Sequence, residues 1–417
     1  MRNAAIVFVV ALLLHVAYFV CDGNSLARDS PKYVIPAENV IAGHGYTRGG
    51  VVETERTPGY PLVLIALRAI GLTLREIALL QHIACALAAA ALVLIARSMT
   101  GNELVAVVSG IVTAIDLPAI YHANLILTET TCMLLALALF MMVWRIARGA
   151  GRPIAAGLLL GAMVLVRPVA MLLFIPLALF LGWTRRDAAR RVVPLFVAGA
   201  LLLPAIWLAR NFYVSGVPTL STNSAVLLLD FHAAGALAVG DPGDFETNFV
   251  RRQRELRQLA DARARAAFGV SDVRSIPYVK RAAIDTRLGR EVVLAHPFAF
   301  ARLFCRGVAA DLLGGGLEAL TRVTTLSRVT AGRLLLVYTS VALLLAIIGE
   351  AWLLRNQRTL GVLILIFVGY FVAFTAGALS YSRFRVPVLP MYAIAVAAGV
   401  NSCSRGLGIR RYRAATR

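Results

Sequence analysis

Ten apolar stretches divide this chain, and only a lipid bilayer would cover so many of them. They cover residues 4–20, 78–96, 103–120, 129–144, 154–166, 168–183, 192–209, 332–353, 359–378 and 386–402. A spanning helix needs about 20 mostly apolar residues. The composition agrees, because 59% of the 417 residues are hydrophobic and 15% are charged, whereas about a quarter of a soluble domain is charged. The sequence therefore predicts an all-α polytopic membrane protein with about ten transmembrane helices.

Arginine and lysine are distributed unevenly between the loops that join these stretches. If the N-terminus is cytoplasmic, the inner loops and the tail hold Arg2, Arg97, Arg145, Arg148, Arg152, Arg185, Arg186, Arg190, Arg191, Arg355, Arg358, Arg405, Arg410, Arg411, Arg413 and Arg417. The short outer loops hold only Arg28, Lys32, Arg48, Arg56, Arg167, Arg383 and Arg385. Because basic loops stay cytoplasmic, we expect both termini inside. The net charge of +20 is then mostly a topology signal, and we expect no nucleic-acid partner.

The first apolar stretch has two interpretations, an uncleaved spanning helix or a cleaved signal peptide. No small-x-small cleavage site follows it, and Phe19 and Val20 precede Cys21, where a lipoprotein signal would have a small residue. We favour the uncleaved helix.

Two outer segments, 21–77 and 210–331, are too long to be simple turns. In the first, the polar start at Asp29 predicts a short amphipathic helix, and Pro58–Gly71 predicts an interfacial or re-entrant helix. The second predicts mostly helix, with a solvated, Arg-rich part over 241–290. The chain then divides into a membrane core with the first outer loop (1–209), an outer region (210–331), C-terminal transmembrane helices (332–403) and a basic cytoplasmic tail (404–417).

Carboxylates and arginines gather at the predicted outer face. They include Asp29, Glu53, Glu55, Arg56, Asp116, Glu129, Arg167, Arg210, Arg383 and Arg385. One interpretation is that they only anchor helix ends at the interface. The other is a site for a phosphate-linked substrate, in which arginine binds the phosphate through forked hydrogen bonds and a carboxylate takes a proton from an attacking hydroxyl.

Several short motifs resemble those of a known family. They are Asp29-Ser30-x-x-Tyr33, Ala37-Glu38-Asn39, Gly43-His44-Gly45-Tyr46, Thr57-Pro58-Gly59-Tyr60-Pro61, Leu127-Thr128-Glu129-Thr130, Ala209-Arg210-Asn211 with Gly216 and Ser221-Thr222-Asn223, and Ser382-Arg383-Phe384-Arg385-Val386-Pro387. Their order and placement resemble the GT-C glycosyltransferases, in the branch with protein O-mannosyltransferases and the bacterial lipid A aminoarabinose transferase.

The resemblance implies a membrane enzyme that moves a sugar from a polyprenyl-phosphate donor to an outer acceptor, with inversion at the anomeric carbon. It implies a catalytic site in the first outer loop, where Asp29 acts as general base or positions the acceptor. Arg56 and Tyr33 are the matching residues near the lipid phosphate. Family members often have two adjacent acids, whereas Asp29 is followed by Ser30. Glu129 is either the second acid or only a helix cap.

The remaining site residues follow from the same resemblance and from their predicted place at the outer face. We expect Arg167, Arg210, Arg383 and Arg385 to contact the donor phosphate, and His44, Glu55 and Tyr60 to contact substrate. No cofactor is certain, and participation of a divalent cation stays open. The expected partners are the lipid-linked donor, membrane lipids and an envelope acceptor, which is a glycan, lipid or protein.

The expected location is the bacterial inner membrane, with the active site facing outside. The alternative function is a multi-pass transporter or flippase of a lipid-linked substrate. An enzyme requires Asp29, Arg56 and Glu129 to converge, within about 15 Å, on one substrate. A transporter has no such requirement.

Overall fold

The computed structural model describes residues 1–23 and 26–415, and they are almost entirely helical. The α-helices are α1 (Arg2–Asp22), α2 (Pro31–Ile41), α3 (Gly59–Ala69), α4 (Leu74–Thr100), α5 (Glu103–Ala114), α6 (Leu117–Ala123), α7 (Glu129–Ala147), α8 (Pro153–Val166), α9 (Phe174–Thr184), α10 (Ala189–Ser215), α11 (Asn223–Val226), α12 (Ala234–Gly240), α13 (Phe245–Phe268), α14 (Tyr278–Ala295), α15 (Pro297–Leu313), α16 (Leu317–Val323), α17 (Arg328–Asn356), α18 (Arg358–Thr375) and α19 (Leu389–Ala415). The shorter elements are the 3-10 helices η1 (Pro168–Leu173), η3 (Val273–Ser275) and η4 (Ser382–Val388), the π-helix η2 (Leu227–Ala233), and strands β1 (Thr47–Arg48) and β2 (Val51–Val52). The last two residues of the predicted tail, 416–417, lie outside the described residues.

Among the described residues, eight helices are long and apolar enough to cross a membrane, or up to ten if each of two bent pairs forms one span. This confirms the prediction of an all-α polytopic membrane protein. Two predicted spans differ in length from that prediction. Residues 154–166 form α8, and residues 168–183 form η1 and α9, all shorter than a full span. At 1.5 Å per residue, α8 is about 21 Å long.

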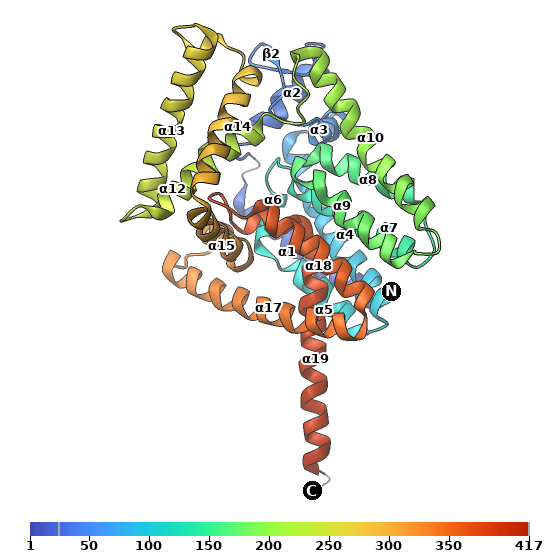
Figure 1. Ribbon diagram of the computed structural model, residues 1–417. Coiled ribbons are helices and arrows are strands. Elements are labelled where there is room, and N and C mark those ends of the chain that lie inside the picture. The colour runs from blue at the N-terminus through green and yellow to red at the C-terminus, as the bar shows by residue number, and fades with distance from the viewer. Residues whose placement is uncertain (24–25, 416–417) are drawn as a thin grey trace.

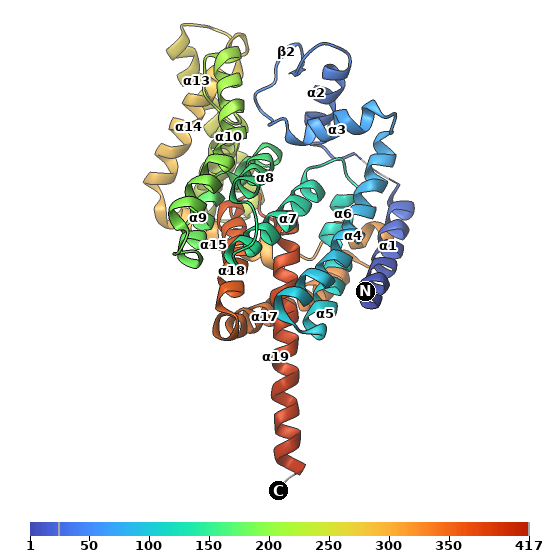
Figure 2. The ribbon, with the colours of Figure 1, turned by 90° about the vertical axis from the view of Figure 1, so that its right-hand side faces the viewer.

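The second outer segment holds more apolar helix than the sequence analysis predicted. Residues Asn223–Gly240 pass the length and composition test for a span, and so does the pair Tyr278–Ala295 and Pro297–Val323, which is bent by 99°. Between these two segments, α13 forms the predicted Arg-rich helix, which the start of α14 continues. In Figures 1 and 2, α13 and α14 lie on the same side of the molecule as α2 and β2, whereas α19 projects on the opposite side.

The ends of the long helices alternate between two ends of the bundle. At one end, Asn3 donates to Glu103 (2.7 Å), Asn102 to Asn401 (2.9 Å) and Gln357 to the Thr100 carbonyl (3.4 Å). At the other end lie Asp29, Asp116, Arg167 and Arg383, which follow α1, α5, α8 and α18 and whose contacts are described below. Which end faces the outside stays a prediction.

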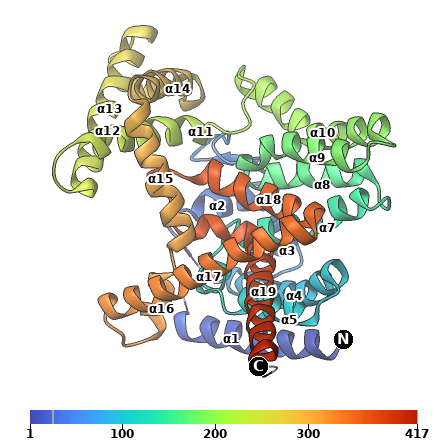
Figure 3. The same ribbon diagram turned by 60° about the horizontal axis from the view of Figure 1, so that its bottom comes forward.

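Glycines allow the long helices to pack backbone to backbone. A Cβ on Gly157 of α8 would lie 2.1 Å from the Phe196 carbonyl oxygen of α10, and one on Gly349 of α17 would lie 1.9 Å from the Ala395 carbonyl of α19. Small residues permit such close contacts between membrane helices. Figure 3 shows the result from below, with α8, α9 and α10 side by side and α17 crossing α19. These contacts hold the bundle that carries the polar site.

Candidate active site

Two arginines from distant parts of the chain meet a buried carboxylate at one end of the bundle. Glu129, the first residue of α7, is fully buried, and its Oε1 lies 3.1 Å from Arg167 Nη1. Arg383 of η4 donates its Nε hydrogen to the same oxygen. The N-cap residue of α7 is Thr128, which makes no side-chain capping hydrogen bond. The described side-chain hydrogen bonds of Glu129 are those with the two arginines.

Asp29 lies on the other side of Arg383. Its Oδ2 is 3.5 Å from Arg383 Nη1, and its Oδ1 is 3.8 Å from Arg56 Nη2 and 3.9 Å from Lys32 Nζ. The Asp29 side chain is 36% exposed, whereas that of Glu129 is fully buried. We call Asp29, Arg56, Glu129, Arg167 and Arg383 the arginine–carboxylate cluster. Asp29, Arg56 and Glu129 thus converge as an enzyme requires.

The start of α2 leaves the Asp29 carboxylate free for these cations. Ser30 is the N-cap residue, with Pro31 as the first helical residue, a position that tolerates proline because it needs no backbone donor. The cap has no side-chain hydrogen bond to the helix, and the Ser30 hydroxyl accepts instead from the Ala27 amide, at 2.8 Å. The short amphipathic helix predicted after Asp29 is therefore present. Asp29 immediately precedes its N-cap residue and does not cap the helix.

Two aromatic rings, Tyr33 and Tyr60, support Arg56. Its guanidinium carbon lies 5.3 Å from the centre of the Tyr33 ring, and Tyr33 packs edge to face on Tyr60. The Tyr60 hydroxyl donates to Gln81 (2.9 Å), and Gln81 in turn donates to the Ala123 and Leu125 carbonyls, just before Glu129. This chain of contacts fixes the first outer loop relative to α7. It also commits the Tyr60 hydroxyl to Gln81.

The glycine of the Thr-Pro-Gly-Tyr-Pro motif, Gly59, lies where no side chain would fit. A Cβ at Gly59 would lie 2.5 Å from the Leu165 carbonyl carbon, closer than side chains approach a backbone. Glycine therefore lets the start of α3 rest directly on the end of α8. Because Arg167 follows α8 and Arg56 precedes α3, this contact brings the two arginines to the same end of the bundle.

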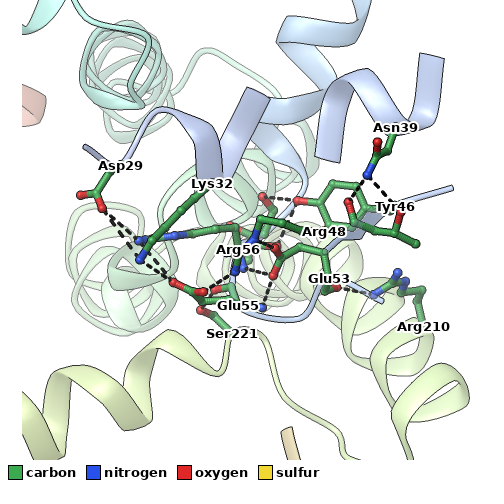
Figure 4. Close-up of polar contacts among 12 residues, drawn as sticks. Asp29, Lys32, Asn39, Tyr46, Arg48, Glu53, Glu55, Arg56, Arg210 and Ser221 are labelled. Atoms are coloured by element: carbon green, nitrogen blue, oxygen red, sulfur yellow. Dashed lines mark hydrogen bonds and ion pairs between the residues drawn. The ribbon is translucent and has the colours of Figure 1, made fainter. Parts of the chain in front are cut away.

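A second set of charges, Lys32, Arg48, Glu53 and Glu55, borders the cluster. The two-residue hairpin of β1 and β2, turned by Gly49 and Gly50 at positive φ, places Arg48 so that it donates to both Glu53 and Glu55. Glu55 also lies 2.9 Å from Lys32 Nζ and 3.6 Å from Arg56. Figure 4 shows Asp29, Lys32, Glu55 and Arg56 side by side, joined by the ion pairs described here.

Electrostatics in this second set favour the ionised forms. Burial disfavours the Glu55 carboxylate, but the hydrogen bond and charge of Lys32, with the charges of Arg56 and Arg48, outweigh it and lower the pKa of Glu55. Burial likewise opposes the charge on Arg48, and its bonds to Glu53 and Glu55 raise the pKa of Arg48 above its ordinary value. Positive and negative side chains therefore alternate in this second set, and both Glu55 and Arg48 stay ionised.

Three sequence-predicted residues lie away from both the cluster and the residues that border it. Arg385 is 3% exposed, pairs with Asp116 at 2.9 Å and donates to the Leu312 carbonyl. Arg210 donates to the Glu53 carbonyl (3.0 Å) and to Asn211, and stacks on Trp207; Figure 4 shows it away from Asp29. His44 is exposed on the turn before β1. The structure brings Asp29, Tyr33, Glu55, Arg56, Glu129, Arg167 and Arg383 together, with the Tyr60 ring behind them.

Lys32 and Tyr381 also contact the cluster, although neither is among the sequence-predicted site residues. Lys32 was recognisable, because it lies one helical turn after Asp29. Tyr381 accepts a hydrogen bond from Arg383 (3.2 Å) and stands two residues before it. Its ring carried no distinctive signal in the sequence.

No group of three or more His, Cys, Asp or Glu side chains within residues 1–23 and 26–415 is placed to hold a metal ion. In the cluster, arginines contact both carboxylates. The donor set therefore suits an anion better than a cation.

Comparison with known proteins agrees with this geometry. No curated protein gives a significant match to the chain. Residues 55–209 match the family model of dolichyl-phosphate-mannose-protein mannosyltransferase, a segment that includes Arg56, Glu129 and Arg167. Asp29 and Arg383 lie outside the matched segment and reach the site through the fold. The match confirms the predicted resemblance and supports a membrane glycosyltransferase of the GT-C, mannosyltransferase type.

Proposed function

We propose that this protein transfers a sugar from a polyprenyl-phosphate-linked donor to a hydroxyl acceptor at the outer face of the bacterial inner membrane, with inversion. The observation that carries the proposal is the arginine–carboxylate cluster, in which a half-exposed carboxylate and a buried one share Arg383. An arginine that contacts both can hold a phosphate beside the group that accepts a proton.

In this mechanism, Asp29 is the general base. The acceptor hydroxyl attacks the anomeric carbon of the donor, and its proton moves to Asp29 as the new carbon–oxygen bond forms. The bond between that carbon and the phosphate oxygen breaks, and its electron pair stays on the phosphate. Arg56 and Arg383 stabilise that charge. A phosphate already paired with arginine needs no proton to leave, so one carboxylate is sufficient.

The unpaired atoms of the cluster support this division of roles. Arg56 Nε is buried and has no partner among the described residues, and buried donors are normally satisfied. A phosphate oxygen would supply the missing acceptor. Glu129 is too buried to meet an acceptor and instead positions Arg167 and Arg383. We propose structural roles for Arg385, Arg210 and the Tyr60 hydroxyl, because each is already committed to a protein partner.

The test is transfer of labelled sugar from a panel of polyprenyl-phosphate sugars, mannose first, by the full chain in nanodiscs. Asp29→Asn keeps the side-chain shape and removes the base, so we expect a loss of about 10²- to 10⁴-fold. Asp187→Asn is the matched control, because Asp187 is exposed and pairs only with its neighbour Arg185. The configuration of the product, followed by NMR, checks inversion.

Three outcomes are informative. Loss in Asp29→Asn alone, with normal size-exclusion behaviour, supports the proposal. Equal transfer by both variants would remove Asp29 from the chemistry and make Glu129 the candidate base. Absence of transfer by the wild type from every donor would contradict the proposal and favour the transporter or flippase.

A further inference from the structure

A buried histidine stands beside the cluster and has no part in the mechanism above. His122, on α6, is 4% exposed. Its Nδ1 lies 2.7 Å from the Pro118 carbonyl oxygen. A carbonyl has no hydrogen to give, so Nδ1 carries the hydrogen of the neutral ring and Nε2 is left as an acceptor.

The Nε2 atom is uncommitted. It has no hydrogen-bond partner among the described residues, yet it is not one of their fully buried unsatisfied polar atoms. It therefore keeps contact with solvent-accessible space. This is unusual for a side chain so deeply enclosed, because buried polar groups normally find protein partners.

The surroundings of His122 belong to the proposed site. Its ring centre lies 6.2 Å from that of Tyr381, and the Tyr381 hydroxyl accepts from Arg383 at 3.2 Å. The charges of Glu129, Arg383 and Arg167 all act on the imidazole. Tyr381 is 42% exposed, so part of its side chain stays open to a ligand.

The cluster offers a bound sugar few free acceptors. Guanidinium groups only donate. Asp29 is needed for the attacking hydroxyl. Glu129 Oε1 already accepts from two arginines, and Glu129 Oε2, which has no described partner, is fully buried. A sugar hydroxyl that points away from the phosphate therefore finds in Nε2 a neutral acceptor that no protein group uses.

We propose that His122 Nε2 accepts a hydrogen bond from one hydroxyl of the transferred sugar and so selects donors that carry that hydroxyl. The inference rests on the proposed function and adds a specificity-determining residue to it. Tyr381 supplies an apolar surface for the same sugar. A site built to bond a hydroxyl discriminates against analogues that lack it, because its own polar group is left unpaired.

The experiment compares polyprenyl-phosphate mannose with its monodeoxy analogues, using the full chain in nanodiscs. His122→Asn keeps a donor near the Nδ1 position for the Pro118 carbonyl but has nothing at Nε2. His122→Gln reaches the Nε2 position with its amide. His296→Asn is the control, because His296 is exposed between α14 and α15. Size exclusion and thermal melting check the fold of each variant.

We expect wild type and His296→Asn to use one deoxy analogue about tenfold less well than mannose in kcat/KM. His122→Asn should use the two donors almost equally, mainly through weaker use of mannose, and His122→Gln should recover part of the difference. Unchanged discrimination in His122→Asn would overturn the inference and leave the proposed function standing. Failure of the wild type with every donor of the panel would overturn both.

Discussion

Two arginines on the same short helix have opposite surroundings. Arg385 of η4 is almost fully buried, and Asp116 and the Leu312 carbonyl satisfy it. Arg383, two residues earlier, contacts the buried Glu129 and the half-exposed Asp29, and donates to the Tyr381 hydroxyl. A 3-10 helix has three residues per turn, so side chains two apart point in different directions.

We call Arg385 and Asp116 the closed pair, because protein groups satisfy both. We call the arginine–carboxylate cluster around Arg383 the open set, because some of its polar atoms have no protein partner. The closed pair joins η4 to the N-cap of α6, because Asp116 also accepts from the Ala119 amide at 2.9 Å. The cluster has one carboxylate oxygen, Glu129 Oε2, and one arginine nitrogen, Arg56 Nε, that are buried and have no described partner. We infer that the closed pair supports the fold and the open set handles a ligand.

The largest effect should come from breaking the closed pair. Arg385→Leu leaves Asp116 charged and buried, and loss of one member of a buried pair costs about 3–5 kcal/mol. Adding Asp116→Asn keeps the helix cap and removes the stranded charge, so the double variant should recover much of the stability. Thermal melting in nanodiscs measures both. A double variant no more stable than Arg385→Leu would show that the pair is not what holds η4.

The next largest effect should come from Arg383→Lys, which should lower sugar transfer without a comparable loss of stability. Arg383→Lys keeps a positive charge but cannot fork between Asp29 and Glu129. Removing one donor to a developing negative charge costs about 10²- to 10³-fold in rate, so transfer should fall by that amount. The melting temperature should fall much less than in Arg385→Leu. If Arg383→Lys lost stability as Arg385→Leu does, the two arginines would not differ in role.

Glu129→Gln should have an intermediate effect, through the arginines that it positions. The change keeps the side-chain volume and removes one charge, and a charged hydrogen bond contributes about 1.5–3 kcal/mol. We expect kcat/KM for the donor to fall about tenfold to a hundredfold, chiefly through KM. Glu38→Gln is the matched control, because Glu38 forms an exposed pair with Arg68 at 2.8 Å. A collapse of kcat at unchanged KM would instead favour Glu129 as the base.

Much of this arrangement could be predicted from the sequence. The apolar stretches indicated a polytopic helical protein, and the alternation of their ends placed Asp29, Glu129, Arg167 and Arg383 on one face. The pairings could not be predicted, because they depend on contacts between residues far apart in the chain. Nothing local distinguishes Arg383 from Arg385.

Helix lengths marked a second limit of the sequence analysis. Residues 154–166 looked like a span of uncertain length, and only the structure shows that α8 ends where Gly59 of α3 rests on it. Likewise, 223–240 was assigned to the outer region, although its helical stretch is apolar enough to span. Such boundaries depend on packing between elements, which the pattern of apolar residues does not record.

The smallest effect should come from Glu55, which borders the open set; we call its ion pairs with Lys32, Arg48 and Arg56 the rim. The pKa of Glu55 is lowered in the folded protein, so its ion pairs stabilise the fold above the ordinary pKa of about 4.5 and are lost as the pH falls through the lowered value. Glu55→Gln removes this contribution, and a partly exposed pair contributes about 1 kcal/mol or less. Wild type should therefore melt slightly above Glu55→Gln near neutral pH, and the two curves should converge once the pH falls below the lowered pKa of Glu55. A difference that persists in acid would mean that Glu55 acts through packing or neutral hydrogen bonds, and the rim would then resemble the closed pair more than the open one.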